Sequence, residues 1–281
     1  MIRRVEIGTA TIEFSDEGPR ALPSEMALRD PVVLLHGFTG SKDSWRDLRE
    51  ELSRDRRVIS IDLPGHGGTR VGGEVENYSI GGAAAMVIAL LTNVRGIPSF
   101  SLVGYSMGGR LALFIALEYG AHINRLVLES ASPGISDPDE RASRRQADEE
   151  LAAFAESAGI EAFVSRWESL PLFESLATLP PDRMRRLRQQ RLACSAEELA
   201  RSLRGMGTGA QPWLGDELSK LSMPVLAIAG ALDSKFASIG RHLGLQVRRA
   251  RFEVIGGAGH LPHLERPTEF NRVVADFLDG R

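Results

Sequence analysis

Residues 100–119 read FSLVGYSMGGRLALFIALEY, which joins a short apolar run, a glycine-flanked turn and a helical pattern. Residues 100–104 have the length and composition of a buried strand, and residues 108–119 repeat apolar side chains with helical spacing. The turn between them, residues 104–108, matches the pattern G-x-S-x-G. A serine on such a strand-to-helix turn presents its hydroxyl at a helix N-terminus, where the helix dipole favours negative charge. We therefore interpret the turn as a nucleophile elbow with Ser106 as its reactive residue.

Other parts of the chain repeat the alternation of strand and helix. Apolar runs that resemble buried strands cover residues 31–36, 57–62, 125–129, 225–230 and 251–255, and residues 5–14 alternate with a strand-like period of two. Uninterrupted apolar runs are typical of parallel sheets, whose strands are buried on both faces. Helical patterns lie at residues 44–52, 80–93 and 268–278. This alternation predicts a mostly parallel, doubly wound α/β sheet.

Residues 133–212 interrupt that alternation. They contain no convincing strand, are rich in charge and in helix formers, and carry Pro171, Pro180 and Pro181 as helix breakers. A stretch of about 80 residues is too long for a plain loop. We expect an inserted helical lid on an α/β core formed by residues 1–132 and 213–281. A separate helical domain fits less well, because strand patterns resume after the segment.

The partners of Ser106 follow it in the chain. Folds with this elbow carry the serine, then an acid, then a histidine. Asp233 follows the run at 225–230 and His260 follows the run at 251–255, so both lie at the carboxyl ends of strands, where open α/β sheets bind ligands. His260 would accept the serine proton and Asp233 would fix the imidazole tautomer. The rival acids Asp216 and Glu253 are misplaced relative to those ends. The sequence thus predicts an α/β-hydrolase fold with a Ser106–His260–Asp233 triad.

Two backbone amides are expected to form an oxyanion hole. One belongs to Met107, the residue after the elbow serine. The second should come from the loop after the run at 31–36, where Phe38 follows a glycine that permits the required turn. We interpret His36 as a structural hydrogen-bonding residue, and His263 as structural or at the pocket rim, because neither has a catalytic role to fill.

Composition excludes several classes of function. The net charge of −3 provides no basic field for nucleic acid, and no window approaches the roughly 18 apolar residues of a membrane span. Residues 1–14 lack the apolar stretch of a signal peptide, so we expect a cytoplasmic location. Cys194 is the only cysteine and the six histidines lack metal-site spacing. We expect neither a metal nor a cofactor, and nothing in the sequence specifies an oligomeric state.

Arginines distinguish this chain from a plain esterase. Arg110 lies four residues after Ser106, and residues four apart share a helix face. A permanent cation beside the serine suits an anionic substrate. The alternative is a structural ion pair. Most of the many arginines in residues 133–212, such as Arg186, are expected to be solvated surface.

Several segments together resemble the family of 2-succinyl-6-hydroxy-2,4-cyclohexadiene-1-carboxylate synthases, which are menaquinone-pathway lyases of the α/β-hydrolase superfamily. The resemblance covers about residue 31 to the end, and its most specific parts are the Arg110 elbow, the Gly-Thr-Gly-x-Gln segment and Asp-Ser-Lys-Phe. The matching segments are residues 36–41, 104–110, 140–141, 167, 171–173, 191, 205–212, 233–236 and 259–260.

The resemblance implies a small tricarboxylate as the substrate and no cofactor. It implies Arg110, Arg141 and Arg191 as partners of the three carboxylates, and Trp167 in the pocket. Tyr105 and Ser41 are further residues that it carries over to the substrate site.

The reaction that the resemblance implies is elimination of pyruvate from 2-succinyl-5-enolpyruvyl-6-hydroxy-3-cyclohexene-1-carboxylate, with Ser106 and His260 as the base. One alternative is a serine hydrolase that cleaves an ester or carbon–carbon bond with the same triad, because fold alone does not fix function. A covalent ester on Ser106 would mark that alternative. The other is a non-catalytic receptor, which has no need of a strained elbow and would show no turnover.

Overall fold

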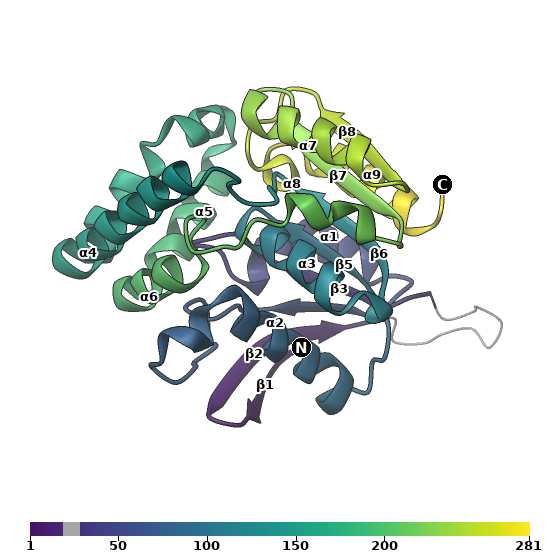
Figure 1. The fold of residues 1–281 in the computed structure, drawn as a ribbon, viewed down its shortest axis with the longest axis horizontal. Helices are drawn as coiled ribbons and strands as arrows, with labels where there is room; N and C mark the ends of the chain where they lie inside the picture. Colours follow the sequence, from purple (N-terminus) through teal and green to yellow (C-terminus); the bar gives the residue numbers. More distant parts are fainter. Residues whose placement is uncertain (19–28) are drawn as a thin grey trace.

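The computed structural model describes residues 1–18 and 29–281. Within these residues the strands form one sheet in the order β1-β2-β4-β3-β5-β6-β7-β8 (Figure 1). In this order, neighbouring strands from β4 to β8 pair parallel. At one edge, the β1–β2 and β2–β4 pairings are antiparallel. The strands are β1 (Ile2–Ile7), β2 (Ala10–Glu17), β3 (Val32–Leu35), β4 (Val58–Ile61), β5 (Phe100–Tyr105), β6 (Ile123–Glu129), β7 (Val225–Gly230) and β8 (Ala250–Ile255).

Helices cover both faces of this sheet. One face carries α1 (Arg46–Leu52) and α9 (Pro267–Leu278), and the other carries α2 (Ile80–Ala89), α3 (Met107–Glu118) and α7 (Ser234–Gln246). All four residues of β3 are apolar because both faces of this strand are buried. Val33 and Leu35 pack into the core under α2 and α3, while Val32 and Leu34 pack into the core under α1 and α9. The predicted doubly wound, mostly parallel α/β sheet is confirmed.

The structure corrects the interpretation of residues 5–14 as one strand. They form a hairpin instead, with β1 and β2 on either side of a turn at Gly8, whose φ is +60°. Glycine adopts this left-handed conformation at little cost. The two-residue turn lets Ile7 pair directly with Ala10, so the alternation changes phase there, from apolar residues at odd positions before the turn to apolar residues at even positions after it. The reading of one continuous strand overlooked this change of phase.

The helix α7 was not apparent from the sequence pattern. Its apolar stripe is narrow: Phe236, Ile239 and Leu243 follow helical spacing, but only Gly240 and Leu243 of its residues are buried. Its start is instead set by Asp233, whose side chain accepts a hydrogen bond from the Phe236 amide as an N-cap.

Between β6 and β7 the fully described chain forms helices and no strand. These are α4 (Pro138–Glu168), the 3₁₀ segment η5 (Pro171–Thr178), α5 (Pro181–Leu192), α6 (Ala196–Met206) and the 3₁₀ segment η6 (Gly215–Lys220). The three α-helices lie together at one side of the sheet (Figure 1). They have a small apolar core of their own, which includes Phe163 and Leu199. The helix α4 is broken at Gly159, where φ is +79°.

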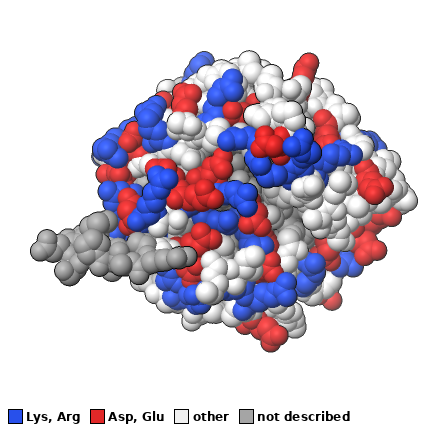
Figure 2. Space-filling view, turned by 180° about the vertical axis from the view of Figure 1, so that it is seen from behind, with Lys and Arg blue, Asp and Glu red and all other residues white. Residues whose placement is uncertain are grey.

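The surface mixes charges of both signs. Figure 2 shows Lys and Arg side chains interspersed with Asp and Glu over the face seen from behind, rather than a broad area of one sign. None of the helices in the described ranges is long and apolar enough to cross a membrane.

Candidate active site

The turn between β5 and α3 holds Ser106 in a strained backbone conformation, with φ of +50° and ψ of −109°. Glycines make this turn possible. A Cβ atom at Gly108 would lie 2.2 Å from the Leu35 carbonyl oxygen, and one at Gly104 would lie 2.3 Å from the Gly108 carbonyl oxygen. The Ser106 amide donates a hydrogen bond of 2.8 Å to the Glu129 carbonyl, which ties the turn to β6. The elbow is thus built on rigid parts of the sheet.

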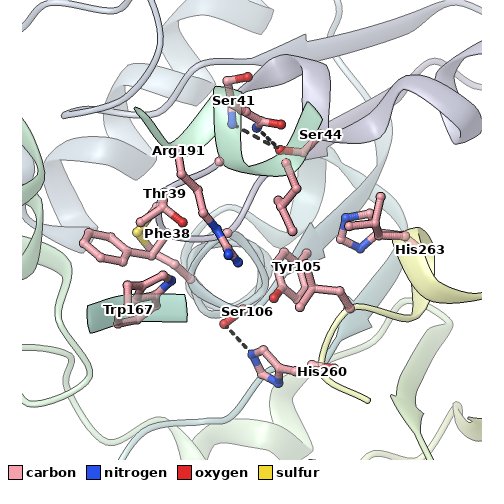
Figure 3. Close-up of a pocket in the computed structure, with 18 of the residues that line it drawn as sticks. Phe38, Thr39, Ser41, Ser44, Tyr105, Ser106, Trp167, Arg191, His260 and His263 are labelled. Carbon is pink, nitrogen blue, oxygen red and sulfur yellow. Dashed lines mark hydrogen bonds between the residues drawn. The ribbon is translucent and has the colours of Figure 1, made fainter. Parts of the chain in front are cut away.

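The three predicted triad residues lie together at the carboxyl ends of β5, β7 and β8. His260 Nε2 is 3.1 Å from Ser106 Oγ, and His260 Nδ1 is 2.7 Å from Asp233 Oδ2 (Figure 3). The second carboxylate oxygen of Asp233 accepts the Phe236 amide at 3.2 Å, which fixes the carboxylate. His260 is only 2% exposed. This geometry lets Asp233 hold the imidazole while Nε2 receives the serine proton.

Glu265 supports the loop that carries His260, and sequence reasoning missed it. Its buried carboxylate accepts the Gly259 amide at 2.8 Å and the Leu261 amide at 3.0 Å, on either side of the histidine. Buried carboxylates with such partners are strongly held in place. The only available signal was an acid shortly after the histidine.

His263 forms a second buried pair, with Glu129 at the end of β6. Both the backbone amide and Nδ1 of His263 lie 2.9 Å from Glu129 Oε1, and the imidazole packs against Trp45 and Tyr105. Glu129 is completely buried, and the sequence pattern did not single it out. These contacts support a structural role for His263 beside the cavity.

The two residues expected to form the oxyanion hole lie in the same cavity as Ser106. Phe38 and Met107 both line the cavity that contains the serine, and neither amide donates to any residue that the structure describes. The loop carrying Phe38 is braced by His36, whose Nδ1 donates to the Gly37 carbonyl and whose Nε2 accepts the Leu63 amide. His66 also holds this loop, since its Nε2 accepts the Thr39 amide at 3.2 Å. Both imidazoles are therefore neutral structural groups.

Acid is expected to destabilise the fold through these two histidines. Burial lowers the pKa of His36 to about 4, and burial with the neighbouring His36 lowers the pKa of His66 to about 3. In the unfolded chain both titrate near pH 6.5, so below that pH the unfolded state binds protons that the folded state does not. Their stabilising contribution is thus complete above pH 6.5. It should fall by about 1.4 kcal/mol per pH unit for each histidine, down to its folded pKa.

Urea unfolding at pH 7, 6 and 5 would measure this slope. His66→Gln keeps an acceptor for the Thr39 amide but removes one titrating group, so the slope should become shallower. His242→Gln, at an exposed position on α7, is the matched control and should leave it unchanged. Equal slopes in the wild type and His66→Gln would contradict the assignment.

The triad opens into a cavity of about 890 Å³ between the sheet and the helices α4 to α6. Most of the substrate residues expected from the resemblance line it, and Figure 3 shows several of them around Ser106. They are Ser41, Tyr105, Arg110, Trp167 and Arg191.

Arg110 is buried in this cavity wall without a carboxylate partner. Its Nη1 donates to Gln211 Oε1 at 3.0 Å and its Nη2 to the Met206 carbonyl at 2.8 Å. It makes no ion pair with an acidic side chain of residues 1–18 or 29–281. Burial, with a smaller effect of Arg144, lowers the pKa of Arg110 to about 10, so the group is still a cation at neutral pH. The alternative of a structural ion pair is not supported.

Arg191 and Trp167 approach the serine from the helices between β6 and β7. Arg191 is 2% exposed, donates to Glu168 at 3.2 Å and lies 5.0 Å over the Phe173 ring, while its Nε has no partner. Figure 3 shows its guanidinium pointing toward Ser106 and Tyr105. Trp167 packs against Phe38 and Phe173, and its indole N–H is also unpaired. Among residues 1–18 and 29–281, these two buried donors have no hydrogen-bond partner.

The structure adds information on three other arginines that the sequence pattern did not provide. Arg141 does not line the cavity in this conformation, and its guanidinium contacts the Ile135 carbonyl at 3.4 Å. Arg144, one turn further along α4, does line it. Arg186, expected to be solvated surface, is exposed, but it also lies at the cavity rim and pairs with Asp182.

Comparison with known proteins agrees with the geometry. The model of the alpha/beta hydrolase fold family matches residues 30–267. A putative 2-succinyl-6-hydroxy-2,4-cyclohexadiene-1-carboxylate synthase from Bacillus subtilis is 40% identical over 94% of this chain and 93% of its own length. The structure of MenH from S. aureus superposes with a TM-score of 0.89 at 33% identity, over 95% of this chain and 98% of that one.

A malate-bound thermophilic esterase from Thermogutta terrifontis is also similar, with a TM-score of 0.84 and 27% identity over 99% of this chain and 98% of that one. The sheet, the elbow and the Ser-His-Asp geometry define an α/β-hydrolase-fold enzyme. Within that class, the chain belongs to the family of the 2-succinyl-6-hydroxy-2,4-cyclohexadiene-1-carboxylate synthases.

Proposed function

We propose that this enzyme is a lyase of menaquinone biosynthesis that converts 2-succinyl-5-enolpyruvyl-6-hydroxy-3-cyclohexene-1-carboxylate to 2-succinyl-6-hydroxy-2,4-cyclohexadiene-1-carboxylate and pyruvate. The observation that carries the proposal is Arg110, a buried cation in the cavity of the triad that has no acidic partner in the part of the chain that the structure describes. A neutral ester gives no compensation for burying such a charge, whereas a substrate carboxylate does. The names of the relatives point to the same substrate.

In this proposal the triad acts as a base. Ser106, activated by His260, removes the proton next to the succinyl ketone, and the C–H electrons form an enolate. The Phe38 and Met107 amides stabilise the developing negative charge on the carbonyl oxygen. Electrons then move through the ring double bond and the C–O bond to the enolpyruvyl group breaks. The leaving group departs as the enolate of pyruvate and takes up one proton, equal to the one removed by the base, to become pyruvate. The elimination uses no acyl-enzyme and no step requires a cofactor.

The three substrate carboxylates are assigned to Arg110, Arg191 and Arg141. Arg110 comes from the core, and the other two come from residues 133–212, which we propose act as a lid over the cavity. Arg141 would enter the cavity only when the lid closes further on the substrate. Trp167, Tyr105 and Ser41 would surround the ring and the succinyl chain, in agreement with their positions along the cavity wall.

The direct test supplies the enolpyruvyl precursor and follows two signals. Pyruvate release and diene absorbance should rise together in equal amounts. Diene formation without pyruvate, or no turnover at all, would refute the lyase assignment.

A serine hydrolase is the second candidate, because Ser106 Oγ lies 3.1 Å from His260 Nε2 and the Thermogutta esterase is similar over the whole chain. The two mechanisms differ at Ser106 Oγ, which forms a covalent ester with the substrate in the hydrolase but only accepts a proton in the lyase. We expect rapid-quench mass spectrometry during turnover of the precursor to find no substrate-derived ester on Ser106, and no burst of product. Trapping such an ester would favour the hydrolase.

A further inference from the structure

The segment from Met206 to Gln211 surrounds the guanidinium of Arg110 with neutral acceptors. The Met206 carbonyl and the Gln211 side-chain oxygen accept its two hydrogen bonds. Gln211 is 1% exposed, and the oxygen must face Arg110 because a guanidinium has no acceptor atom for an amide N–H. Its Nε2 is buried and has no hydrogen-bond partner among the residues that the structure describes.

Contacts with α4 hold this segment in place. Asp148, which is 4% exposed, accepts the Gly209 amide at 3.1 Å, and Arg145 donates to the Gly209 carbonyl at 3.2 Å. Gly207 and Gly209 are required because α4 approaches their backbone too closely for a side chain. A Cβ atom at Gly209 would lie 2.3 Å from the Arg145 amide nitrogen, and one at Gly207 would lie 2.6 Å from Asp148 Oδ2. The position of Gln211 is therefore fixed by the fold.

A glutamate at position 211 would satisfy the local electrostatics better than glutamine does. It would give the buried Arg110 a counter-ion and would remove the unpaired amide donor, both of which carry a free-energy cost. Proteins accept such local costs mainly at functional sites. A neutral residue has one advantage here, since the charge of Arg110 is not already neutralised when an anionic ligand arrives.

We propose that Gln211 is a specificity-determining positioning residue, which holds Arg110 with a neutral acceptor so that its charge stays available to a substrate carboxylate. The inference rests on the proposed function for the identity of that substrate. It assigns a role to the Gly-Thr-Gly-x-Gln segment, which no step of the proposed reaction uses.

The test compares Gln211→Glu and Gln211→Met with the wild type. In Gln211→Glu the new carboxylate should pair with Arg110, so KM for the enolpyruvyl precursor should rise about ten- to a hundredfold. Because the loss is one of binding, kcat should change much less. The melting temperature should be unchanged or higher, since a buried cation gains a counter-ion. Gln211→Met removes the acceptor without adding charge, so it should lower the melting temperature and raise KM less.

Gln189→Glu is the matched control, because it adds the same charge at an exposed position of α5 that does not line the cavity. It should behave like the wild type. A KM for Gln211→Glu close to that of Gln189→Glu would overturn the inference. So would equal losses in Gln211→Glu and Gln211→Met with parallel falls in melting temperature, because that pattern marks a purely structural role.

A binding measurement separates this inference from the proposed function. Calorimetric titration with propane-1,2,3-tricarboxylate requires no turnover. If the wild type does not convert the precursor, weaker tricarboxylate binding in Gln211→Glu than in the wild type would still support the role of Gln211. The same affinity in both proteins, or binding to neither, would refute it.

Discussion

Replacing Ser106 with alanine is expected to lower kcat for pyruvate release by about 10²- to 10⁴-fold, the range that positioned acid–base catalysis contributes. The reason is geometric. Ser106 Oγ is the only group hydrogen-bonded to His260 Nε2 among the described residues, and Ser106 directly precedes the N-terminus of α3. Steady-state rates on the enolpyruvyl precursor measure the effect, and the melting temperature should stay near that of the wild type.

His260→Ala should lose a similar factor, and the double variant little more, because residues that act as one unit are strongly non-additive. Asp233→Asn should also be impaired, since an amide cannot hold the imidazole in the required tautomer. Full activity in Ser106→Ala would remove the serine from the mechanism. Multiplicative losses in the double variant would mean that the two residues act in separate steps.

The elbow and triad could be predicted because their signals are local. Residues 100–119 contain the strand, the turn and the helix in one stretch, and Asp233 and His260 each follow a recognisable apolar run. Parallel strands then bring these ends to one edge. The hairpin of β1 and β2 was missed because the change of phase at its turn is a single short irregularity in the alternation. The helix α7 was missed because its apolar residues are few, and only Gly240 and Leu243 of its residues are buried.

The supporting residues could not be predicted because their roles depend on tertiary contacts. Glu265 and Glu129 are ordinary acids in the sequence. Only the fold shows that both are buried, that Glu265 accepts two backbone amides and that Glu129 contacts His263. The arginines show the same limit. Helical spacing placed Arg110 near Ser106, but spacing alone could not show that its hydrogen-bond partners are neutral, nor that Arg144 and Arg186 line the cavity.

Arg110→Ala is expected to lower kcat/KM for the enolpyruvyl precursor by about ten- to a hundredfold. A charge-assisted hydrogen bond contributes about 1.5–3 kcal/mol, and each 1.4 kcal/mol is a factor of ten. The guanidinium lies one helical turn past Ser106, so its loss removes the cation nearest the reacting centre on α3. Arg191→Ala and Arg141→Ala should cost comparable factors if those residues bind the outer carboxylates. The Arg141 variant in particular tests whether the lid closes further.

Arg110→Lys should recover only part of the loss, because an ammonium keeps the charge but not the bidentate fork that matches a carboxylate. It also cannot donate to Met206 and Gln211 with the same geometry while facing a ligand. Arg272→Ala is the appropriate control, since Arg272 is exposed on α9 and pairs with Asp276. Arg186 is unsuitable because it lies at the cavity rim. If Arg110→Ala, Arg141→Ala and Arg191→Ala all matched the Arg272→Ala rates on the precursor, the tricarboxylate assignment would be wrong. An esterase acting on a neutral substrate would then explain the triad better, because a neutral substrate forms no charge pairs with the arginines of the cavity.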